Sequence, residues 1–111
     1  MDRNERINKL KEFYAANSHD SFIIYALANE YMQNGDDDEA LKYYSELLEK
    51  FPDYVATYYH LGKLYARRSL ITEALQTYKT GMQKAQLAKD SHSFAELQTA
   101  HTNLELGLDD E

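Results

Sequence analysis

The sequence contains no cysteine, and its 111 residues include only one proline and four glycines. Without cysteine, neither disulfides nor thiolate metal sites can contribute to the fold. No run of residues approaches the ~18 apolar positions that a membrane span requires. The first residues, Met1 to Arg6, also lack the apolar core of a secretory signal. We therefore expect a cytoplasmic protein that neither crosses a membrane nor enters an oxidising compartment.

Basic residues are also in short supply, since 12 lysines and arginines stand against 19 aspartates and glutamates, for a formal net charge of −7. Nucleic acids and anionic membranes both require a concentrated basic surface, so we expect neither as a partner. The apolar fraction of 43% and the charged fraction of 28% are ordinary for a globular protein. The scarcity of proline and glycine suits an all-α chain, and the length predicts a single domain over residues 1–111.

One stretch, from Ser21 to Pro52, has landmark residues that recur 34 positions later. Tyr25, Leu27, Tyr31, Glu39, Ala40, Leu41 and Tyr44 return as Tyr59, Leu61, Tyr65, Glu73, Ala74, Leu75 and Tyr78. In each copy the first apolar residues have the spacing of one helical face, and a second such face follows after a turn. Each copy is therefore predicted to be a pair of antiparallel helices, with small residues such as Ala28 and Gly62 allowing close approach.

This period resembles that of the tetratricopeptide repeat, whose signature combines an aromatic residue, Leu-Gly, Tyr, a later Ala, a second aromatic residue and a closing Pro. The second copy supplies Tyr58, Leu61, Gly62, Tyr65, Ala74 and Tyr78, and the first copy ends at Pro52. The resemblance implies an all-α, right-handed solenoid of antiparallel helix pairs. We expect the centre of the core to be formed by Leu61, Tyr65 and their counterparts Leu27 and Tyr31.

Six helices are expected, in two full repeats, 21–53 and 55–89, between two capping helices. The expected helices span residues 2–17, 21–34, 37–51, 54–68, 70–88 and 92–106. Segment 2–17 is interpreted as a half-repeat, because its apolar residues Ile7, Leu10 and Tyr14, shifted by 34, fall on apolar positions of the second helix. A surface helix is the alternative. Phe13 is expected on the same face, and Asp2-x-x-Glu5 is expected to start the helix.

The second repeat departs from the pattern at three positions. Ser69 replaces Gly35 in the turn, Gly81 replaces Leu47, and Gln86 stands where Pro52 would recur. We therefore expect an extended second helix, with Gly81 at a close helix approach. Segment 92–106 is expected to begin with a capping box, Ser93-x-x-Glu96, and to close the C-terminal end. The remaining residues, from Leu106, are expected to fray.

No catalytic or metal-binding constellation is evident. The four histidines, His19, His60, His92 and His101, lack the spacing of three or four that a helical metal pair requires. The acidic run from Asp36 to Glu39 lacks the ligand spacing of a calcium loop and is explained as a helix cap. We expect no enzyme activity, no cofactor and no metal.

In each repeat the first helix of the pair is called the first-type helix and the second the second-type helix. A second stripe of residues lies on each first-type helix, on the side that the sequence predicts to face away from its partner helix. The resemblance implies that these positions line a concave groove that binds extended peptides or helices. Coverage by the opening helix or by a second subunit is the alternative, since aromatic residues are unusual on a solvated face. The predicted groove residues are Phe22, Tyr25, Asn29, Met32, Gln33, Tyr59, His60, Lys63 and Arg67.

Some members of the family hold a terminal carboxylate with a clamp of Lys and Asn residues, and this chain matches it in part. Asn29 agrees, whereas Tyr25 and His60 occupy the places of other clamp residues. Lys63 and Arg67, one turn apart, form a cationic spot that suits an acidic ligand. The sequence thus predicts a protein-interaction module for a peptide or protein segment. The alternative is a self-associating scaffold that uses the groove as a homodimer or homo-oligomer interface.

Overall fold

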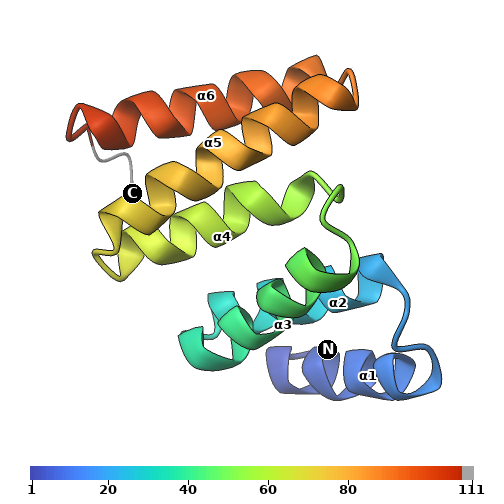
Figure 1. Ribbon diagram of the computed structural model, residues 1–111. Helices are drawn as coiled ribbons and strands as arrows, with labels where there is room; N and C mark the ends of the chain where they lie inside the picture. The colour runs from blue at the N-terminus through green and yellow to red at the C-terminus, as the bar shows by residue number, and fades with distance from the viewer. Residues whose placement is uncertain (109–111) are drawn as a thin grey trace. The chain divides into compact units, whose positions relative to one another are not determined.

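The computed structural model describes residues 1–108, and within them every regular element is an α-helix (Figure 1). The helices are α1 (Arg3–Ala16), α2 (Ser21–Gln33), α3 (Asp37–Lys50), α4 (Ala56–Arg67), α5 (Ile71–Leu87) and α6 (Ser91–Glu105). Each helix begins and ends within two residues of the range expected from the sequence. The predicted all-α fold is confirmed.

Two compact units make up the chain, Met1–Tyr54 and Val55–Glu111. In the first unit, α2 packs against both α3 and α1. The faces of α2 and α3 that the spacing predicts as apolar supply most of the buried side chains, although Leu41 and Leu48 are only half-buried. The buried residues of this hairpin are Ile24, Leu27, Ala28, Tyr31, Ala40, Tyr43, Tyr44 and Leu47.

The turn between α2 and α3 depends on Gly35, which has a φ of +83°. This left-handed conformation is accessible to glycine at little cost, and it ends α2 as predicted. Asp36 precedes α3 but makes no side-chain hydrogen bond to the first turn of that helix. Its carboxylate instead accepts a hydrogen bond from the Asn34 side chain at 2.9 Å. Asp36 thus occupies the N-cap position without a side-chain bond, and the acidic run meets the start of α3 through Asp37, Asp38 and Glu39 in its first turn, as predicted.

Helix α1 begins with the predicted capping box. The Asp2 carboxylate accepts a hydrogen bond from the Glu5 backbone N–H at 2.8 Å, and the Glu5 carboxylate accepts one from the Asp2 N–H at 3.0 Å. Ile7 is the buried residue of this helix. Phe13 is 51% exposed, so its predicted burial is wrong. It lies about 100° around the helix from Tyr14, which faces α3.

Polar contacts also attach α1 to its neighbours. The guanidinium groups of Arg3 and Arg6 both bind Glu30 of α2, at 3.3 and 3.2 Å. The Tyr14 hydroxyl donates to the Glu46 carboxylate of α3 at 3.0 Å. Burial, with this carboxylate beside it, raises the pKa of Tyr14. Helix α1 is thus held by one buried side chain and several partly exposed polar groups.

In the second unit, α5 packs against both α4 and α6, and α4 also contacts α6. Tyr65 is half-buried, so the prediction that it is a core residue is wrong. Its counterpart Tyr31 stacks on Tyr43 with ring centroids 5.8 Å apart, whereas the residue equivalent to Tyr43 in the second unit is Thr77. Tyr65 therefore has no equivalent ring against which to pack. The apolar core of this unit is Tyr58, Leu61, Leu64, Ala74, Tyr78, Ala85 and Leu97.

Two glycines let the helices of the second unit approach closely. A Cβ atom on Gly62 would lie 2.3 Å from the Tyr78 ring, far inside van der Waals contact. A Cβ on Gly81 would lie 2.5 Å from the Cβ of Tyr58 and 3.1 Å from Leu97. The predicted close approach at Gly81 is confirmed.

Helix α5 has 17 residues against 14 in α3, which confirms the expected extension. Lys89 follows it in the left-handed conformation, with a φ of +59°. Asp90 then caps α6, because its carboxylate accepts a hydrogen bond from the Ser93 backbone N–H at 3.0 Å. Ser93 is therefore the third residue of the helix, and the predicted capping box of Ser93 and Glu96 is wrong.

Another left-handed residue, Gly107, ends α6 with a φ of +74°. The Gly107 N–H donates to the Leu104 carbonyl at 3.2 Å, and the Leu108 N–H donates to the Asn103 carbonyl at 2.7 Å. Residues 106–108 thus form a hydrogen-bonded turn, and the expectation of fraying is wrong for them. Residues 109–111 lie outside the described part of the chain.

Candidate interaction surfaces

In the first unit, the predicted binding stripe begins with two aromatic residues of α2. Phe22 is 64% exposed, which is unusual for a phenylalanine on a helix. Tyr25 is half-buried, and its ring meets the edge of the Tyr54 ring with centroids 5.5 Å apart. Phe22 therefore presents a bare aromatic surface, whereas Tyr25 is partly engaged within its own unit.

The rest of this stripe makes contacts inside the unit. The Tyr44 hydroxyl of α3 donates a hydrogen bond to the Asn29 side-chain oxygen and lies 3.6 Å from the sulfur of Met32. Asn29 and Met32 therefore face their partner helix, and the expectation that they turn away from it is wrong. The exposed Gln33 accepts a hydrogen bond from Arg3 of α1 at 3.1 Å.

In the second unit, Tyr59, His60 and Lys63 form a contiguous group on α4. The Tyr59 and His60 rings meet edge to face with centroids 5.4 Å apart, and the Lys63 ammonium lies 5.5 Å from the Tyr59 ring centroid. This is the geometry of a cation–π interaction. Burial lowers the pKa of His60, and Lys63 adds to this effect while Glu96 opposes it.

A cavity of about 730 Å³ lies in the second unit beside the C-terminal half of α4. Lys63 and Arg67 line it from α4. The other walls come from α5, α6 and the turns that flank them. The apolar side chains that line the cavity are Ala66 of α4 and, from the other walls, Ile71, Ala100, Leu104 and Leu108, with Tyr78 and Asn103 beside them. The cavity thus combines two cationic side chains with aliphatic walls.

The spacing of Lys63 and Arg67 along α4 predicts a pair of cations, and α6 also contributes to the cavity that they line. The α6 residues Ala100, Asn103 and Leu104 have the spacing of one helical face, which was a usable signal. Helix α6 was interpreted only as a cap, although the same face that packs on the unit also forms a cavity wall. The site is therefore larger and more apolar than the α4 residues alone indicate.

Residues 1–108 include no group of three His, Asp or Glu side chains arranged to hold a metal ion. Over the same residues, no helix has both the length and the apolar character to cross a membrane. The described surfaces offer aromatic contact, aliphatic burial and ionic attraction.

A known protein family matches the part of the chain that contains most of these candidate residues. Residues 25–86, more than half of the chain, match the family model described as tetratricopeptide repeat. This chain belongs to the tetratricopeptide repeat family. Repeats of this family are generally protein-protein interaction modules and are typically non-catalytic. The predicted family is therefore confirmed.

Solved structures of tetratricopeptide repeat proteins agree with this assignment. A tetratricopeptide repeat domain protein from Salinibacter ruber is 41% identical in its solution NMR structure, which covers 83% of this chain and 92% of that one with a TM-score of 0.76. A crystal structure of a tetratricopeptide repeat domain protein from Salinibacter ruber is 42% identical, covers 81% and 100% of the two chains, and gives a TM-score of 0.75.

A third structural neighbour shows the fold alone. The solution structure of a Bordetella parapertussis protein is 23% identical, covers 91% of this chain and 88% of that one, and has a TM-score of 0.80. No curated protein matches the sequence. The comparisons therefore assign the family and the fold, and the ligand has to be inferred from the surfaces of this chain.

Proposed function

We propose that this tetratricopeptide repeat protein binds a partly acidic protein segment through the α4 face and the adjoining cavity of its second unit. The observation that carries the proposal is the placement of Lys63 and Arg67 in one cavity with aliphatic walls. A segment with a bulky aliphatic side chain beside carboxylates would match both features. Apolar anchors supply most of the affinity of such interfaces, and charges mainly supply orientation and specificity.

Each group has a distinct role in this proposal. Ile71, Leu104 and Leu108 would contact the aliphatic anchor of the ligand, since they line the cavity. Lys63 and Arg67 would pair with its carboxylates. Tyr59 lies close to the Lys63 ammonium and limits the positions that this ammonium can adopt.

The other predicted site residues fit this proposal to different degrees. His60 adjoins Tyr59 on α4 and would border the ligand. Phe22 offers an exposed aromatic contact on α2. Tyr25, Asn29, Met32 and Gln33 also make contacts inside the first unit, so any role in binding would be added to a structural one.

Selection from a displayed library of random peptides, followed by calorimetry at two salt concentrations, tests the proposal. We expect selected peptides to combine large aliphatic residues with Asp or Glu, and to bind more weakly at high salt. Reversing both cavity cations, Lys63→Glu with Arg67→Glu, should weaken binding at least about tenfold, equivalent to about 1.4 kcal/mol.

Arg68→Glu is the charge-matched control for Arg67→Glu alone, because Arg68 is likewise an exposed arginine but does not line the cavity. It changes the net charge without changing the proposed site. If Arg67→Glu and Arg68→Glu affect binding of the selected peptides equally, or if the peptides carry no acidic residues, the cavity is not the site.

A further inference from the structure

Phe13 of α1 is exposed, although the residues at the equivalent position of the other second-type helices, α3 and α5, are buried. The residue 34 positions later, Leu47 of α3, has no exposed surface. The next equivalent, Gly81 of α5, lies directly against Tyr58 of α4, as the short distance to a Cβ placed there shows. This position is thus fully buried in α3 and contacts the first helix of its pair in α5, whereas in α1 it carries a phenylalanine that is 51% exposed.

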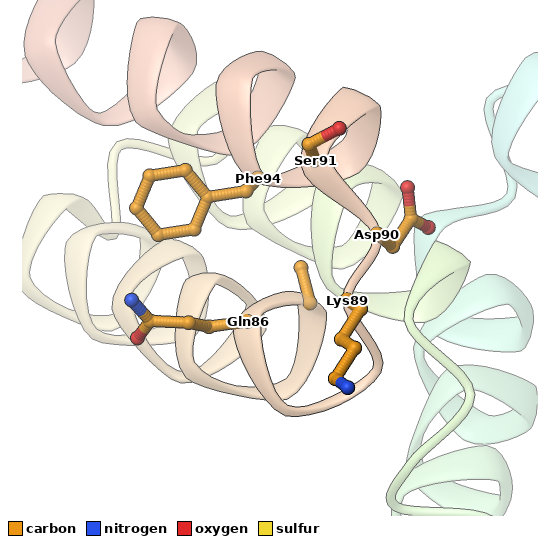
Figure 2. A pocket seen from close by; sticks show the side chains of 6 residues that line it. Gln86, Lys89, Asp90, Ser91 and Phe94 are labelled. Atoms are coloured by element: carbon orange, nitrogen blue, oxygen red, sulfur yellow. The ribbon is translucent and has the colours of Figure 1, made fainter.

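A pocket at the junction of α5 and α6 has the complementary character. It has a volume of about 310 Å³ and is lined by Ala85, Gln86, Lys89, Asp90, Ser91 and Phe94. In Figure 2 the Phe94 side chain from α6 and the Gln86 side chain from α5 extend in the same direction, and Phe94 presents its ring. The ring is half-buried, so an apolar surface is open to a further group.

Phe94 occupies in α6 the position that Tyr58 occupies in α4. The first-type helices α4 and α6 are offset by 36 residues, since Leu61 and Leu97 are both buried core residues and Tyr58 and Phe94 precede each by three. A residue of the Leu47 and Gly81 type would therefore be the natural neighbour of Phe94. Phe13 is the exposed side chain of that type.

We propose that Phe13 of one copy inserts into the Phe94 pocket of a second copy, so that copies of this chain associate head to tail. Helix α1 of one copy would pair with α6 of the other as a second-type helix pairs with a first-type helix inside the chain. The space is sufficient, because a cavity of about 150 Å³ already accommodates benzene.

Charge favours this pairing over pairing of like ends. Helix α1 carries four lysines and arginines against two glutamates, and it stays net positive when Glu30 of α2, to which Arg3 and Arg6 bind, is included; α6 carries two glutamates and no lysine or arginine. An α1–α6 contact therefore joins surfaces of opposite sign, and an α1–α1 contact would join surfaces of the same sign. The partner that fits the pocket is thus the α1 helix of a second copy.

This association goes beyond the proposed function, because it uses neither the α4 cavity nor its cations. A head-to-tail contact is heterologous, so a dimer retains one free α1 on one copy and one free pocket on the other. Association should therefore continue past the dimer as protein concentration rises, unless the rotation between copies closes a ring.

Sedimentation velocity over a range of concentrations, with light scattering, tests the association. The full chain should increase in mass with concentration, and Phe13→Ser should lower the association constant at least about tenfold. Phe22→Ser is the matched control, since Phe22 is also an exposed phenylalanine, on α2, and its replacement should leave association unchanged. A parent chain that stays monomeric throughout, or an equal effect of both variants, overturns the proposal.

A mixing experiment separates this contact from a symmetric dimer. Gln86→Trp should fill the pocket without disturbing the core, because Gln86 is exposed. Phe13→Ser and Gln86→Trp should each be monomeric alone, whereas an equimolar mixture should form a one-to-one dimer through the one intact α1 and the one intact pocket. If the mixture has the same mass as the separate variants, the head-to-tail contact is absent.

Discussion

The α2–α3 and α4–α5 hairpins share one 34-residue pattern but use different side chains where the two helices meet. In the first hairpin, Ala28 is the small residue, and Asn29 and Met32 contact the hydroxyl of Tyr44. In the second, Gly62 lies against the Tyr78 ring itself. The residues equivalent to Asn29 and Met32 are Lys63 and Ala66, and both line the α4 cavity beside Tyr78. The hairpin in which Lys63 and Ala66 stand in place of Asn29 and Met32 is therefore the one that has the candidate site.

The two turns differ in how their shared backbone conformation is achieved. Gly35 and Ser69 are 34 residues apart and both are left-handed, with φ values of +83° and +62°. The Leu70 N–H donates to the Tyr65 carbonyl and the Asp36 N–H to the Tyr31 carbonyl, both at 2.9 Å. The hairpin therefore imposes the conformation, and serine adopts it at a cost that glycine avoids.

The largest effect should come from truncating the shared core leucines. Leu27 and Leu61 are both fully buried, so Leu27→Ala and Leu61→Ala should each lower the free energy of unfolding by about 2–5 kcal/mol. Urea unfolding measures both. Equal losses with one transition would show that the two hairpins unfold together. A loss below about 1 kcal/mol at either position would contradict its place in the core.

The next largest effect on stability should come from exchanging glycine and alanine at the small residue of each hairpin. Gly62→Ala places a Cβ 2.3 Å from the buried Tyr78 ring, so we expect a loss of about 1–3 kcal/mol from overpacking. Ala28→Gly is the reverse exchange in the first hairpin and should cost about 1 kcal/mol, mainly through backbone entropy. Thermal unfolding of both variants tests the comparison, which fails if Gly62→Ala is neutral or stabilising.

A smaller change of opposite sign is expected at the turns. Ser69→Gly should stabilise the protein by about 0.5–1 kcal/mol, because glycine adopts the left-handed conformation without the steric cost that serine bears. Gly35→Ser should destabilise it by a similar amount. Opposite shifts in urea midpoint are the expected outcome, and shifts of the same sign would mean that the turns are not equivalent.

The smallest effect is a pH dependence specific to the second unit, because His60 replaces Ala26 of the first. Burial lowers the pKa of His60 below its usual 6.5, so the unfolded chain binds a proton first as pH falls. His60 therefore leaves the free energy of unfolding unchanged above about pH 6.5 and lowers it as the pH falls further. Urea midpoints at pH 7.5 and 5.5 should converge in His60→Gln, and an unchanged difference would exclude His60 as the cause.

The repeat made the fold predictable, because apolar spacing and a 34-residue period are properties of the sequence itself. Helix limits, the close approach at Gly81 and the longer α5 all follow from it. The prediction of a helix cap was wrong where two nearby side chains could both cap the same helix. Asp90 caps α6 three residues ahead of the predicted Ser93, since either side chain can accept the same type of backbone hydrogen bond.

The candidate site was less predictable, since it depends on contacts between helices. Periodicity places Asn29 and Met32 near the edge of the α2 face, and only the reach of the Tyr44 hydroxyl decides that they contact α3. Likewise, no spacing along α4 indicates that Leu104 and Leu108 complete a cavity with Lys63 and Arg67. These relations depend on side-chain length and helix packing rather than on period.

The attachment of α1 has a consequence for the kinetics of the native state. Its ion pairs converge on one carboxylate, Glu30, and are partly exposed, so each contributes little and is weakened by salt. With Ile7 as its buried side chain, α1 is expected to open locally without unfolding of the α2–α3 pair. Amide hydrogens of α1 would then exchange with solvent before those of α2, and faster as ionic strength rises. Ionic strength would thus set how often the N-terminal helix detaches from its neighbours.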